Sequence, residues 1–126
     1  MVNIAPATTA IFPWIGANSG TVDVVYYGTT AASKDDPSAV WNTYLAQTND
    51  NGASFTQSTA SNTPNHVGVI CTGGTGCAPG TRNLLDLFKV AINPGDGRAG
   101  IIYTDDTLTK DSSGNPLPQI VLSQQQ

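Results

Sequence analysis

The chain has 126 residues, enough for one small domain with a hydrophobic core. Hydrophobic residues make up 39% of it and charged residues only 11%, a balance that argues against intrinsic disorder. The net charge is −4 and the five cations are scattered, which excludes the clustered basic surface that nucleic-acid binding requires.

Two further features bear on where the protein works. No apolar run is long enough to span a bilayer, so we expect no membrane contact. Residues 1–10 show no basic segment followed by an apolar one, so we expect no signal peptide.

The first half of the chain predicts four β-strands joined by turns. The apolar runs are short, rich in β-branched and aromatic residues, and bounded by Gly, Asn, Asp and Pro. They cover residues 11–15, 22–27, 41–47 and 55–59. We interpret residues 10–60 as a four-stranded antiparallel meander.

The second half repeats this pattern but stops early. A connecting loop, residues 61–81, holds both cysteines. Residues 84–92, 99–104 and 120–123 are then predicted to be strands. Residues 82–124 therefore form a second meander that lacks its fourth strand.

The two halves align with each other over most of their length. At an offset of 77 residues, the difference between positions 24 and 101, residues 24–26 fall on residues 101–103 and Leu45 falls on Leu122. Internal repetition of a four-stranded unit is typical of β-propellers, whose blades pack against their neighbours. We therefore predict one all-β unit of about two propeller blades, the second incomplete.

Residues 48–55 carry a recognisable turn motif. Thr48, Asp50, Gly52, Ser54 and Phe55 occupy the fixed positions of a pattern that resembles the Asp box of bacterial neuraminidase repeats. Asp50 is placed to accept backbone amides across the turn, Gly52 to take a positive φ, and Phe55 to anchor the hairpin. We expect this motif to staple the turn between strands three and four rather than to bind a ligand.

The wider resemblance is to secreted bacterial proteins of the sialidase-like, Asp-box β-propeller family. Residues 12–15, 24–28 and 82–88 carry it, and it extends over residues 10–124. It implies the terminal blades of a longer propeller, of about six blades.

The resemblance does not bring a catalytic site with it. A sialidase needs an arginine triad to clamp the substrate carboxylate and a Tyr nucleophile paired with Glu. This chain has two Arg and no Glu. We therefore expect a non-catalytic module that acts as a binding or structural element. The alternative is part of a sialidase-class glycoside hydrolase whose catalytic residues lie outside this chain.

Asp86 interrupts an apolar run that the blade order makes innermost. A buried carboxylate needs partners, and Arg82 and Lys89 are the nearest cations in the sequence. The three residues form either a structural ion pair or a ligand site facing the central channel.

Three other carboxylates are candidate calcium ligands. Asp96 lies in a turn, Asp105 and Asp106 begin a polar loop, and Asp35 and Asp36 lie in the corresponding loop of the first half, residues 29–38. The alternative is that these acids are simply solvated. Adjacent strand residues point to opposite faces, so neither pair is a natural acid–base dyad. No other cofactor is expected.

Cys71 and Cys77 flank a Gly-rich stretch that permits a disulfide. A metal site is the alternative, but two thiolates alone are too few. A disulfide implies an extracellular or cell-envelope setting for the native parent protein.

The last expectation concerns partners. Two isolated blades would expose apolar faces and open strand edges. We therefore expect a homo-oligomer assembled head to tail, with a trimer as the best single prediction, and a glycan as a further candidate partner.

Overall fold

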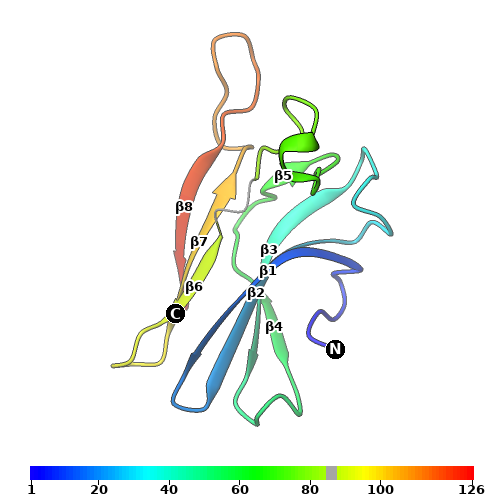
Figure 1. Cartoon of the computed structure of the whole chain (residues 1–126). Helices are drawn as coiled ribbons and strands as arrows, with labels where there is room; N and C mark the ends of the chain where they lie inside the picture. The colour runs from blue at the N-terminus through cyan, green and yellow to red at the C-terminus, as the bar shows by residue number, and fades with distance from the viewer. Residues whose placement is uncertain (85–87) are drawn as a thin grey trace.

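The protein is all-β and forms two antiparallel sheets (Figure 1). The computed structural model describes residues 1–84 and 88–126. The first sheet contains β1 (Thr9–Asn18), β2 (Thr21–Thr29), β3 (Val40–Thr48) and β4 (Thr56–Thr59) in that order, with β5 (His66–Val67) also paired to β3. The second sheet contains β6 (Lys89–Ile92), β7 (Ala99–Asp105) and β8 (Gln119–Gln124) in that order.

In the described part of the chain, the remaining element is one short 3-10 turn, η1 (Gly74–Gly76). Among the described residues, no helix has the length and apolarity required to cross a membrane. The described strands close into neither a barrel nor a complete propeller.

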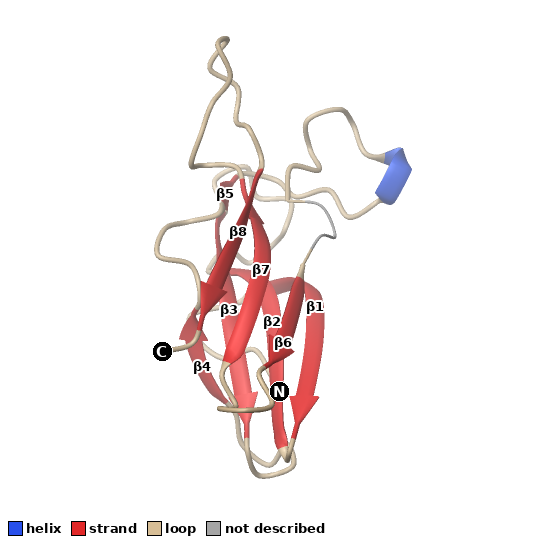
Figure 2. Cartoon of the chain, turned by 90° about the vertical axis from the view of Figure 1, so that its left-hand side faces the viewer, coloured by secondary structure: helices blue, strands red, loops and turns tan. Residues whose placement is uncertain are grey.

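The second sheet lies face to face over the first, with the main core between them (Figure 2). β2 and β3 contribute inward-facing side chains because alternate residues of a strand share one face. The largest contributions come from Val25, Tyr27, Trp41 and Leu45 on the first sheet and from Val90, Ile101 and Tyr103 on the second.

The two sheets come close to each other where β6 packs on β1. A Cβ built on Gly16 would lie 3.3 Å from a side-chain carbon and from the carbonyl oxygen of Val90. The absence of a side chain at Gly16 is therefore what lets the two strands come this close.

A tyrosine hydroxyl joins the two sheets inside the core. The Tyr27 hydroxyl accepts the backbone N–H of Thr104 at 2.9 Å, and its ring stacks on Phe88 at 4.6 Å between centroids. Burial raises the pKa of Tyr27 to about 12, so the hydroxyl stays protonated.

The outer face of the first sheet is covered by the N-terminal segment, residues 1–8. Ala7 packs with Tyr26, Tyr44 and Ala46 in a second, smaller core. The Gln57 side chain holds the segment in place by accepting the backbone N–H of Ile4 at 3.1 Å and donating to its carbonyl oxygen at 3.1 Å.

The all-β prediction is confirmed, and most predicted strands coincide with observed ones. The predicted strand at residues 84–92 is wrong at its start, because the observed strand begins at Lys89 and Leu84 lies in a turn. Leu84 is nevertheless fully buried. Its apolar side chain therefore indicated a place in the core and not a place in a strand. Residues 85–87 lie outside the described part of the chain.

We predict that Tyr27→Phe destabilises the fold by about 1–3 kcal/mol, because the Thr104 N–H would lose its partner inside the core. Urea unfolding measures the change. Tyr44→Phe is the matched control, since the Tyr44 ring is also buried but its hydroxyl makes no hydrogen bond among the described residues. Equal losses in both variants would contradict the prediction.

Candidate functional site

The turn between β3 and β4, which contains Thr48, Asp50, Gly52, Ser54 and Phe55, is closed by a hydrogen-bond network. One Asp50 oxygen accepts the Ser54 backbone N–H at 2.9 Å and the Thr48 hydroxyl at 2.6 Å, and the other accepts the Ser54 hydroxyl at 2.6 Å. Gly52 takes a φ of 85° and donates its N–H to the Thr48 hydroxyl at 3.0 Å. The half-buried Phe55 ring packs against the smaller core.

These bonds have an electrostatic consequence. The hydroxyl and backbone N–H of Ser54, followed by the hydroxyl of Thr48, hold the pKa of the Asp50 carboxyl well below its usual range. The Asp50 carboxylate therefore makes its hydrogen bonds within its own turn.

A second turn of the same chemistry lies between β7 and β8. One Asp111 oxygen accepts the backbone N–H groups of Ser113 and Asn115, each at 2.8 Å, and Gly114 takes a φ of 85°. The side chain of Asn115, followed by its backbone N–H, lowers the pKa of Asp111. This turn was not predicted from the sequence, although Asp111 precedes Asn115 by four residues, the same spacing as that between Asp50 and Ser54.

Asp105 and Asp106 are not solvated loop acids. They are 2% and 3% exposed, at and just after the end of β7, and belong to a buried polar cluster with Asn65, His66 and Asn83. Each buried carboxylate accepts a hydrogen bond from a donor that is distant in the sequence. The interpretation that Asp105 and Asp106 are simply solvated is therefore wrong. Asp35, in the corresponding loop of the first half, is exposed.

Asp106 is the centre of the buried polar cluster. One of its oxygens accepts the Nδ1–H of His66 at 2.7 Å and the side-chain amide of Asn83 at 2.8 Å. Asp105 accepts the amide of Asn65 at 3.3 Å. These bonds tie β5, the turn at Asn83 and the end of β7 together.

The chemistry of this cluster favours a structural role. With Nδ1 bound to Asp106, the other ring nitrogen of His66, Nε2, is buried and has no partner among the described residues. A catalytic histidine needs a nucleophile or solvent within reach of that nitrogen. We therefore interpret the cluster as a fastening between the two sheets.

A buried carboxylate that the sequence analysis did not single out lies on β2. Asp23 is completely buried, and one of its oxygens accepts the Gln47 side-chain amide at 2.8 Å while the other has no partner among the described residues. Burial raises the pKa of Asp23, and the Gln47 bond only partly offsets this.

The structure does not test whether Arg82, Asp86 and Lys89 come together. Lys89 is exposed at the start of β6, opposite Ile102, and Arg82 lies in the segment before the second sheet. Asp86 falls outside the described residues, so the channel-facing site stays a prediction.

Calcium binding also stays a prediction. Asp96 is exposed and accepts the backbone N–H of Arg98 at 3.1 Å within its own turn. Among the described residues, no three His, Cys, Asp or Glu side chains gather in a way that could hold a metal ion.

Cys71 and Cys77 form the expected disulfide, with Cα atoms 5.9 Å apart. A backbone hydrogen bond from Cys71 to the carbonyl oxygen of Thr81, at 3.0 Å, closes the base of the same loop. The bridge is compatible with an extracellular protein.

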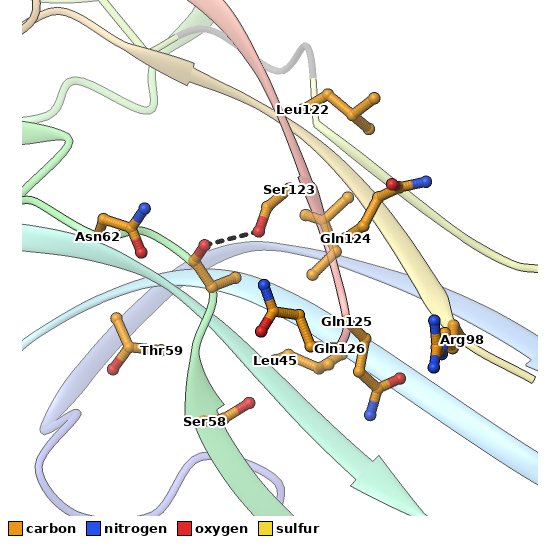
Figure 3. A pocket seen from close by; sticks show the side chains of 12 residues that line it. Leu45, Ser58, Thr59, Asn62, Arg98, Leu122, Ser123, Gln124, Gln125 and Gln126 are labelled. Carbon is orange, nitrogen blue, oxygen red and sulfur yellow. Dashed lines mark hydrogen bonds between the residues drawn. The ribbon is translucent and has the colours of Figure 1, made fainter.

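A cleft of about 760 Å³ opens where the two sheets separate, between β4 and the end of β8 (Figure 3). Hydroxyl, amide and guanidinium groups dominate its lining, including Ser58, Asn62, Arg98 and Gln124. Ser123 points across the strand to the carbonyl oxygen of Ala60, which it binds at 2.9 Å. The cleft therefore offers many hydrogen-bonding groups over a small apolar floor.

Comparisons with known proteins gave no match to any family model, curated protein or solved structure.

We predict that Asp106→Asn destabilises the fold by about 2 kcal/mol, because a buried carboxylate loses charge-assisted hydrogen bonds from His66 and Asn83. Urea unfolding is again the measurement. Asp35→Asn, at an exposed loop position, should leave the midpoint unchanged. A stable Asp106→Asn protein would show that the cluster does not fasten the sheets.

The lowered pKa of Asp50 predicts a dependence of stability on pH. The contribution of Asp50 to the stability of the fold is fully present above its pKa in the unfolded chain, about 3.9. This contribution is lost as the pH falls toward the lower pKa that Asp50 has in the folded protein. Asp50→Ala should therefore melt at a lower temperature than the parent at neutral pH, with the gap narrowing below about pH 4. Asp50→Asn keeps an acceptor oxygen, so its melting temperature should lie between those of Asp50→Ala and the parent protein. A gap that is constant with pH would contradict the assignment.

Proposed function

We propose that this chain is a non-catalytic module of the Asp-box β-propeller type that serves as a binding or structural element. The observation that carries the proposal is the hydrogen-bond network of the Asp-box turn. It joins the third and fourth strands of a meander that is stacked on a second meander. This is where the resemblance places the motif.

The stacking of the sheets supports the propeller interpretation. In a propeller each blade repeats its neighbour by rotation, so the face that one blade turns toward the next is the same in every copy. Val25 and Leu45 face the second sheet, and their equivalents at the offset of 77, Ile102 and Leu122, lie on the far face of that sheet. Equivalent residues of the two sheets therefore point in the same direction along the stack of sheets.

A non-catalytic role is supported by the composition and by the state of the carboxylates. The chain has no Glu and only two Arg, too few for a sialidase site. Asp50, Asp105, Asp106 and Asp111 are each engaged by hydrogen bonds within the chain. The bonds lower the pKa of Asp50 and of Asp111, and carboxylates held in this way are poor general acids.

The cleft between the sheets is the surface we propose for ligand binding, and a glycan is the ligand class. A sugar presents many hydroxyl groups, which match the hydroxyls, amides and guanidinium that line this cleft. Arg98 is exposed at the cleft wall and supplies its only guanidinium.

We predict that neutral or sialylated oligosaccharides give saturation-transfer NMR signals with the wild-type protein, and that Arg98→Ala weakens them. Lys110→Ala is the matched control, because Lys110 is also an exposed cation but does not line the cleft. A fluorogenic sialoside should not be hydrolysed. Absence of transfer from every glycan would remove the proposed ligand, and turnover would favour the glycoside-hydrolase alternative.

A further inference from the structure

The sequence contains one Asn–Gly pair, Asn51–Gly52, and both residues are exposed in the turn between β3 and β4. Asparagine is chemically labile, because its side-chain amide can lose ammonia. In this reaction the backbone nitrogen of the next residue attacks the side-chain carbonyl carbon, Cγ. Glycine favours the attack because it has no side chain to hinder it. This pair is therefore the position in the chain where deamidation is chemically easiest.

The structure holds the pair in a geometry that opposes this attack. Asn51 has a φ of 58° and Gly52 a φ of 85°. The Ala53 N–H closes the turn by donating to the carbonyl oxygen of Asp50 at 3.3 Å. These values are those of a type I′ turn, which favours Asn–Gly and in which the first central residue has a ψ of about 30°. At that ψ the Asn51 Cβ lies nearly opposite the Gly52 nitrogen about the Cα–C bond, so Cγ cannot reach it.

The attacking nitrogen is also occupied. The Gly52 N–H donates to the Thr48 hydroxyl at 3.0 Å, and this hydroxyl donates in turn to Asp50 at 2.6 Å. Because the nitrogen must give up its proton to become a nucleophile, the hydrogen bond to Thr48 has to break first. The Asn51 side-chain amide, by contrast, is exposed and has no hydrogen-bond partner among the described residues. The reactive amide is therefore free, whereas its attacker is held.

We propose that Asn51 is a deamidation site and that opening of the turn at residues 50–53 controls its rate. Turns of this kind open locally without unfolding of the whole domain. In the open turn a base in the solvent takes the Gly52 amide proton, the nitrogen bonds to the Asn51 Cγ, and ammonia leaves, giving a cyclic imide. Water then opens the ring at one of its two carbonyl carbons, which leaves aspartate or isoaspartate at position 51.

Neither product suits the turn that the unmodified chain forms. Isoaspartate adds a methylene group to the main chain, which disturbs the hydrogen bond between Ala53 and Asp50. Both products also place a new negative charge beside the Asp50 carboxylate, whose hydrogen bonds to Ser54 hold the turn. The reaction is not reversed in water, so each molecule that has reacted keeps a weaker connection between β3 and β4.

The test follows the mass that the full chain gains when an amide NH2 is replaced by OH in mildly alkaline buffer, with peptide mapping to locate the change. Wild-type protein should react at position 51 much more slowly when folded than when unfolded in urea. Thr48→Val removes the hydroxyl that holds the Gly52 N–H. It should raise the rate in folded protein about threefold to tenfold, the factor that one lost hydrogen bond supplies.

Two control variants separate the turn from the rest of the fold. Asn51→Gln should abolish the mass gain at this position, because glutamine would have to close a larger ring. Asp106→Asn weakens the fold outside the turn and should leave the rate in folded protein unchanged. Within the same digest, Asn93 and Asn115 should stay unmodified, since each precedes a proline, which has no N–H.

Three outcomes would overturn the proposal. Equal rates in folded and unfolded wild-type protein would mean that the turn does not restrain the reaction. An acceleration in Asp106→Asn as large as that in Thr48→Val would mean that global unfolding controls the rate. The isoaspartate form, once separated, should melt at a lower temperature than unreacted protein, and equal melting would contradict the weakened connection. If Thr48→Val does not fold, the wild-type comparison and Asp106→Asn still decide the question.

Discussion

Packing of one sheet against the other is the contact on which the rest of this molecule depends. The inner faces of the two sheets share one core, because Val25, Trp41 and Leu45 belong to the same buried cluster as Val90, Ile101 and Tyr103 of the second sheet. The Tyr27 hydroxyl makes the contact directional as well as apolar, since it binds the backbone of Thr104 from within the core. A purely apolar interface would permit sliding of the sheets, whereas this bond fixes one strand position against another.

The buried polar cluster joins the two sheets where their strands end. Where the strands end, the chain must place loops between two sheets, and buried loop backbone requires hydrogen-bond partners. Asn65 meets that need at two points, with its carbonyl oxygen accepting the N–H of Asp106 at 3.0 Å and its side chain reaching Asp105. The apolar core and the polar cluster are therefore complementary: the first brings the sheets together and the second fixes how their ends meet.

What the sequence could predict follows from the range of the interactions involved. The strands and the hydrogen-bonded turn at residues 48–55 depend on neighbours within a few residues, such as Ser54 four residues after Asp50, so the sequence pattern alone was enough to predict them. The cysteine pair is also local, six residues apart.

The failures involve contacts across the chain. Asp105 and Asp106 became buried because donors 40 residues away fold onto them, which no local pattern reports. β5 consists of only His66 and Val67, too short for periodicity to detect. The predicted strand start at Leu84 failed for a related reason, since an apolar residue can fill the core from a turn.

The disulfide loop has a consequence of a different kind. Cys71 and Cys77 are joined to each other, and the N–H of Cys71 binds the carbonyl of Thr81, so the segment from 71 to 81 is closed at its own base. The residues of η1 within it add nothing to either core, and its glycines meet open space or the cysteine sulfurs. A segment with this independence tolerates insertion and sequence drift at little cost to the sheets. It is therefore the natural place in this chain to graft a peptide epitope or an affinity tag.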